Sequence, residues 1–136
     1  MRRLSVVVVV VVFSLFGLGA ASAVADTHVE LHASLSGSKA FPHAHGSSTF
    51  ERKGGVRDVD VTVSGIARLS GKRVTVFVAG KKVGRVLVSP GGTAHRDFST
   101  ADGEFVPFAS AGSRVRVTTS RGKLVASGTY HRDRDR

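Results

Sequence analysis

The chain of 136 residues contains no cysteine and no tryptophan, and it has a single tyrosine, a single methionine and three prolines. Without cysteine, the fold cannot be cross-linked by disulfides and must be held by a packed core alone. The absence of cysteine also excludes a thiol nucleophile and a lipid anchor on an N-terminal cysteine.

Acidic residues are scarce as well. Ten Asp and Glu stand against 20 Lys and Arg, which gives a formal net charge of +10, two units of it from Arg2 and Arg3. Such a charge favours anionic partners, for example cell-wall polymers, extracellular nucleic acid or lipid head groups, or it serves solubility alone. The cations are scattered and not interleaved with aromatic residues, so we expect no sequence-specific binding of nucleic acid.

The long apolar run lies at the N-terminus. It follows Arg2 and Arg3, covers residues 4–18 and ends near the small residues ASAVA. This is the pattern of a secretory signal peptide, and the run is shorter than the roughly 20 residues of a transmembrane helix. We therefore predict a signal peptide over residues 1–25, cleaved after Ala25 or alternatively after Ala23, and a secreted, extracellular product without a transmembrane segment.

After residue 25, apolar and polar residues alternate with a period of two, and no helical period is present. The runs that show it are HVELHASL, STFERK, VRDVDVTVSGI, RVTVFV, VGRVLVS, AHRDFST, EFVPF, SRVRVTT and KLVASGTY. Glycine-containing turns separate most of them at hairpin spacing. This pattern predicts one all-β domain over residues 26–130, an antiparallel β-sandwich (immunoglobulin-like or a Greek-key barrel) of about eight strands. The charged residues 131–136 are expected to form a disordered tail.

Three segments, LSGSKAFPHAHGSSTF, VDVTVSGIARLSG and SAGSRVRVTTSRGKLVASGTY, match short motifs of a known family. Taken in this order, they resemble the opening, a central strand and the closing hairpin of the CHRD domain, a secreted β-sandwich-like module. The family's central histidine pair is replaced here by VTVFVAG. The resemblance implies an extracellular binding or structural role and supplies no catalytic residues.

The chain contains six histidines, which are the first candidates for metal binding. His43 and His45 have the i, i+2 spacing that places two imidazoles on one face of a strand, roughly 6.6–6.8 Å apart at Cα. Cleavage after Ala25 would create the terminus Asp26-Thr27-His28, whose amine, amides and imidazole suit planar Cu(II) coordination. Two interpretations stay open: a copper- or zinc-binding protein that uses His28 at the N-terminal Asp26-Thr27-His28 and, separately, His43 and His45 in the His-x-His loop, or surface histidines without a ligand.

A second candidate is a group of cations around the hairpin formed by RVTVFV and VGRVLVS, namely Lys72, Arg73, Lys81, Lys82 and Arg85. They could bind an anionic cell-wall polymer or another extracellular protein. Alternatively, they protect an exposed strand against edge-to-edge association.

No catalytic motif is evident. There is no G-x-S-x-G, and the alternation around Asp58 and Asp60 indicates a solvated strand face. We therefore predict a secreted, non-catalytic protein with a binding or structural role and no cofactor. The alternative is an extracellular copper- or zinc-binding protein.

Overall fold

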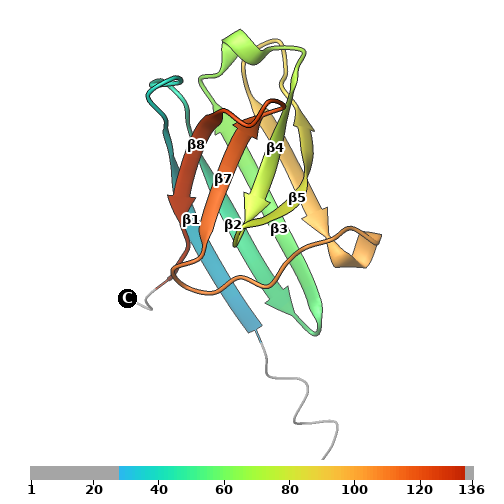
Figure 1. Cartoon of the computed structure of the whole chain (residues 1–136). Helices are drawn as coiled ribbons and strands as arrows, with labels where there is room; N and C mark the ends of the chain where they lie inside the picture. Colours follow the sequence, from blue (N-terminus) through green and yellow to red (C-terminus); the bar gives the residue numbers. More distant parts are fainter. Residues whose placement is uncertain (1–27, 134–136) are drawn as a thin grey trace, which may run out of the picture.

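The computed structural model describes residues 28–133 (Figure 1). The predicted signal peptide, the predicted terminus Asp26-Thr27 and residues 134–136 lie outside the described residues. The described part is built from strands β1 (His28–Gly37), β2 (His45–Lys53), β3 (Val56–Ser64), β4 (Arg73–Val78), β5 (Lys81–Leu87), β6 (Ala94–Ser99), β7 (Arg114–Thr119), β8 (Leu124–Thr129) and β9 (His131–Arg132), with short 3₁₀ turns η1 (Ala67–Leu69) and η2 (Thr100–Asp102).

All pairings are antiparallel, and the strands form one sheet in the order β5-β4-β7-β8-β1-β2-β3-β6, with β9 added beside β1. The sheet curls so that one half, β5-β4-β7-β8, covers the other half, β1-β2-β3-β6, and β5 comes to lie next to β6 (Figure 1). The prediction of an all-β antiparallel sandwich or barrel is confirmed, in the form of a nearly closed, barrel-like sheet.

The alternation seen in the sequence separates an inner from an outer face. In β3 and the middle of β1, every second residue is buried and its neighbours are exposed or half-buried. The strands β4 and β7 show the same alternation, except that Thr75 and Thr118 are buried as well. Valine is common inside because its branched side chain suits a pleated surface. The fully buried core includes Leu31, Phe50, Val59, Val63, Val74, Val76, Val78, Phe98, Val115, Val117 and Tyr130.

The seam between β5 and β6 is closed by side chains. The Arg96 guanidinium donates a hydrogen bond to the Arg85 carbonyl oxygen at 3.0 Å, and it pairs with Glu104 at 2.7 Å. The ring of Phe98 packs directly on Gly84, where a Cβ atom would lie 2.6 Å from a ring carbon. The seam therefore depends on a bare backbone at Gly84.

Two segments differ from the prediction. The run EFVPF forms no strand; Val106 is buried and its carbonyl accepts a hydrogen bond from Arg57 Nε, but Phe105 and Phe108 are exposed. The predicted disordered tail is wrong for His131 and Arg132, which form β9. Since β8 pairs with β1 only at Ser36 and Gly37, the backbone of β1 at Leu31 and His32 is free to pair with these two residues.

Candidate functional site

The structure separates the three histidines predicted to bind metal. In the β1–β2 pair, His28 lies opposite Lys53, whereas His45 lies opposite Ser36. His28 and His45 are thus at opposite ends of the hairpin, roughly 27 Å apart by the rise of an antiparallel strand. The terminus with His28 and the loop with His43 and His45 are therefore two separate candidate sites.

His43 and His45 lie where the turn enters β2. His45 Nδ1 is 3.0 Å from the His43 carbonyl oxygen, so this ring nitrogen is engaged within the turn itself. Gly65 packs against the same carbonyl, and a Cβ atom there would approach it to 2.2 Å. Two groups of His and acidic side chains converge within residues 28–133, and neither includes His43 or His45.

Acidic residues and histidines gather on the outer face of β1, β2, β3 and β6. The register places Glu30 opposite Glu51 and Glu51 opposite Asp58; in the next row Asp60 lies opposite Asp97. We call this surface the acid–histidine face: His28, Glu30, His32, Glu51, Asp58, Asp60, His95 and Asp97.

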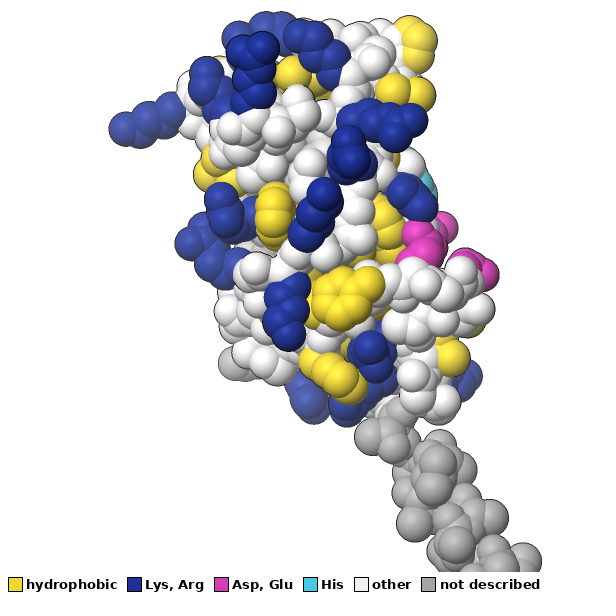
Figure 2. Space-filling model, turned by 45° about the vertical axis from the view of Figure 1, so that its right-hand side comes forward, with side chains coloured by type: hydrophobic (Ala, Val, Ile, Leu, Met, Phe, Trp, Pro, Cys, Tyr) yellow, Lys and Arg dark blue, Asp and Glu magenta, His cyan; other side chains and the backbone are white. Residues whose placement is uncertain are grey.

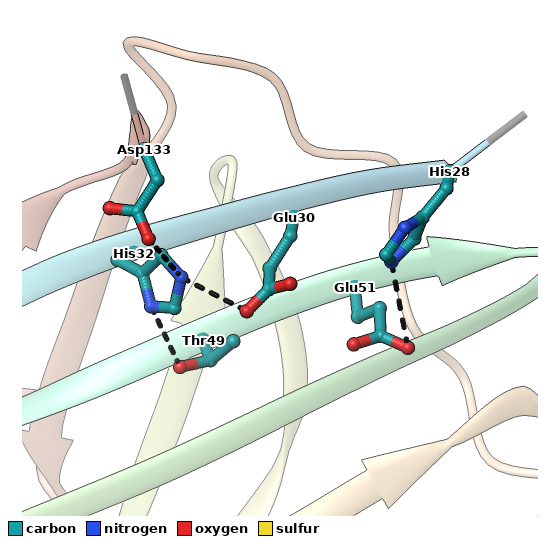
Figure 3. Close-up of polar contacts among 6 residues, drawn as sticks. All are labelled: His28, Glu30, His32, Thr49, Glu51 and Asp133. Carbon is teal, nitrogen blue, oxygen red and sulfur yellow. Dashed lines mark hydrogen bonds and ion pairs between the residues drawn. The ribbon is translucent and has the colours of Figure 1, made fainter. Parts of the chain in front are cut away.

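Histidines are the ion-pair partners on the β1–β2 part of this face (Figure 3). His32 Nε2 lies 3.1 Å from Glu30 and 3.3 Å from Asp133, although neither contact is aligned as a hydrogen bond. His28 Nε2 is 3.9 Å from Glu51, and His28, Glu30 and Glu51 form one of the two convergent groups. This group gives His28 two carboxylate neighbours that the sequence did not reveal.

Asp60, His95 and Asp97 form the second convergent group, on β3 and β6. His95 Nε2 is 3.8 Å from an oxygen of Asp60 and 3.8 Å from an oxygen of Asp97. The other ring nitrogen of His95, Nδ1, lies 3.3 Å from the hydroxyl of Thr62. Partial burial raises the pKa of Asp60, the hydrogen bond with Asp97 and its negative charge raise it further, and His95 opposes the shift.

On the opposite half of the sheet, in strands β4, β5, β7 and β8, every charged side chain is a cation. We call this surface the cationic face: Arg73 on β4, Lys82 and Arg85 on β5, Arg114 and Arg116 on β7. Lys82 and Arg116 both lie opposite Phe77, and Arg85 lies opposite Thr75. The Arg116 guanidinium lies 5.8 Å from the centre of the Phe77 ring.

Of the five cations predicted to meet an anionic partner, Arg73, Lys82 and Arg85 belong to this face. Lys72 and Lys81 lie at opposite ends of the β4–β5 hairpin. Arg114 and Arg116 were missed, although the alternation of RVRVTT already places them on one side of a strand. Their position beside the hairpin depends on the β4–β7 pairing, which joins strands far apart in the chain.

No model of a known protein family and no curated protein sequence matches the chain. The resemblance to the CHRD domain therefore stays a prediction. Among residues 28–133, no helix is long and apolar enough to cross a membrane.

Proposed function

We propose that the protein is an exported, non-catalytic module that binds an anionic polymer outside the cell through its cationic face. The observation that carries this proposal is the segregation of charge. All eight acidic residues between positions 28 and 133 lie on β1, β2, β3 and β6 or in the segments after β6 and β9, and β4, β5, β7 and β8 carry none. Figure 2 shows Lys and Arg over the whole height of the view and acidic side chains only at its right-hand side.

The arrangement of the cations suits a linear ligand. The uncharged outer residues of β4 lie between two rows of cations. One row is Lys82 and Arg85 on β5, and the other is Arg114 and Arg116 on β7. Since neighbouring strands are about 4.8 Å apart, the two rows of cations are separated by roughly 10 Å. A polyanion lying along β4 would meet positive charge on both sides, and Phe77 would form the floor between the rows.

Protection of a strand edge explains only part of this face. Lys82 and Arg85 lie on β5, which ends the hydrogen-bonded order of the sheet, and lysine is common on such edges. Arg114 and Arg116 lie on β7, which is paired on both sides, with β4 and with β8. An interior strand needs no such protection, so these two arginines support a binding role.

Binding to immobilised polyphosphate, measured at several salt concentrations, tests the proposal. Neutralising Arg114 and Arg116 together (Arg114→Gln, Arg116→Gln) should weaken binding and lower the slope of log K against log salt by about one to two, because each phosphate contact contributes roughly 0.7–0.9. The matched control, Lys53→Gln with Arg132→Gln, removes the same charge from the other half of the molecule. Equal losses in both double variants would show that net charge alone acts and would overturn the proposal.

A second candidate function is copper binding at the mature terminus Asp26-Thr27-His28. It is supported by the exposed position of His28 at the start of β1, beside Glu30 and Glu51. A chain that begins at Asp26 should develop a visible Cu(II) absorption band that His28→Ala abolishes, whereas a chain with one additional N-terminal residue should not. N-terminal sequencing of protein recovered from the medium tests both the export and the cleavage site.

A further inference from the structure

We propose that Asp60, His95 and Asp97 bind a divalent transition-metal cation on the acid–histidine face, with zinc as the fitting probe. This site is independent of the cationic face and of the terminus at Asp26. It uses side chains from two strands that are neighbours in the sheet although β4 and β5 come between them in the chain.

The pairing of β3 with β6 builds the site. Asp60 lies opposite Asp97, and Thr62 lies opposite His95, so four outward side chains occupy the corners of one small patch. One ligand atom from each of Asp60, His95 and Asp97 lies within 4.8 Å of the others. Ligand atoms around a tetrahedral zinc ion with bonds of 2.0–2.1 Å are about 3.4 Å apart. The observed 3.8 Å distances from His95 to the two carboxylates therefore need to shorten by only a few tenths of an ångström.

Thr62 orients the imidazole of His95 for metal binding. Metal-binding histidines usually donate their second ring N–H to a neighbouring oxygen, which fixes the tautomer and the direction of the ring. In the tautomer that binds a metal through Nε2, Nδ1 of His95 donates to Thr62 Oγ1, 3.3 Å away, and the Nε2 lone pair is directed toward the two carboxylates. Thr62 is therefore a positioning residue.

The charge around the site favours the binding of a cation. Two carboxylates that face each other across strands destabilise a sheet unless a cation lies between them. The chain has twice as many Lys and Arg as Asp and Glu. Yet within residues 28–133 the carboxylates of the acid–histidine face form no ion pair with Lys or Arg; Arg pairs only with Glu104. Although the chain is rich in Lys and Arg, the basic partners of the carboxylates on this face are therefore histidines.

The donor set selects the metal. An imidazole nitrogen with two carboxylate oxygens suits zinc and similar divalent ions, whereas calcium and magnesium prefer oxygen ligands alone. The other convergent group, His28 with Glu30 and Glu51, has longer acidic side chains. Ordering glutamate costs more side-chain entropy than ordering aspartate, so we expect the aspartate group to bind more tightly.

Calorimetric titration of the untagged, metal-free protein with zinc chloride tests the site. We expect His95→Ala and, separately, Asp60→Asn to weaken zinc binding by at least about tenfold, and Thr62→Val to weaken it by about tenfold. The matched controls are His131→Ala for His95→Ala and Asp58→Asn for Asp60→Asn. Both controls should retain the affinity of the unaltered protein.

Circular dichroism of each variant checks the fold, and Asp97→Asn provides a further variant of the site, on the same strand as His95. In NMR spectra of the histidine rings, the signals of His95 should shift first as zinc is added. The proposal is overturned if the unaltered protein binds no zinc, if His95→Ala binds as tightly as the unaltered protein, or if His28→Ala is the variant that loses the ion.

Discussion

The hydroxyl of Tyr130 lies 2.7 Å from the hydroxyl of Ser48 inside the sheet. Ser48 in turn donates its proton to the carbonyl oxygen of Asp60, 2.8 Å away, so Tyr130 must be the donor to Ser48. The backbone of Tyr130 also bonds to Gly112 and Ser113. Tyr130 thus connects the end of β8 with Ser48 on β2 and, through Ser48, with the backbone of Asp60 on β3.

This environment predicts an unusual titration. Burial raises the pKa of Tyr130 to about 12, against an ordinary value of 10.0. The folded state keeps the proton while the unfolded chain loses it. The contribution of Tyr130 to stability should therefore be constant below pH 10 and should fall by roughly 3 kcal/mol as the pH rises from 10 to 12. Because Tyr130 is the only tyrosine, absorbance at the tyrosinate band follows it directly.

Tyr130→Phe supplies the control for that titration, since it should abolish the absorbance change. It should also lower the free energy of unfolding by about 1 kcal/mol at neutral pH, the usual value of one hydrogen bond. A midpoint near pH 10 in the folded protein would contradict the buried position of the hydroxyl.

The closure of the sheet depends on Gly84. An added Cβ would lie 2.6 Å from the buried ring of Phe98, which has little room to move. Gly84→Ala should therefore lower the free energy of unfolding by about 1–3 kcal/mol, as overpacking of a core usually does. Chemical denaturation measures this loss. Gly91→Ala is the control, because a Cβ there meets nothing closer than 4.0 Å; equal effects of the two changes would show that the seam is not tightly packed.

The segment between β6 and β7 is held by Arg57. Its Nε donates to the carbonyl oxygen of Val106 at 2.8 Å, and its guanidinium lies 4.1 Å from the centre of the exposed Phe108 ring. Lysine keeps the charge but lacks the planar group that makes both contacts. Arg57→Lys should therefore speed amide exchange in residues 103–113 and proteolysis there. Arg132→Lys should leave both rates unchanged, and equal rates in all three proteins would contradict this role.

The strands were predictable from the sequence because each run by itself alternates apolar and polar residues with a period of two. The register was not, because it joins runs that are far apart in the chain. His95 is distant in sequence from every other histidine, and the alternation around Asp60 indicated a solvated face. Only the β3–β6 pairing places the two residues together. The run EFVPF has the composition of a strand, but Pro107 has no N–H to donate to a ladder, and the segment uses Val106 as a buried anchor instead.

The facing charges of Asp60 and Asp97 lead to a prediction for the stability of the metal-free protein. Like charges opposite each other in an antiparallel pair cost about 0.2–1 kcal/mol. Asp97→Asn removes one of them and supplies an amide that can donate to Asp60. With EDTA present, this variant should be more stable than the unaltered protein by up to about 1 kcal/mol in a thermal or urea melt. Asp102→Asn, in the 3₁₀ turn η2, is the control and should change nothing. With excess zinc the order should reverse, because the unaltered protein gains binding energy that Asp97→Asn has lost. A variant that is less stable under both conditions would show that Asp97 serves the fold rather than a cation site.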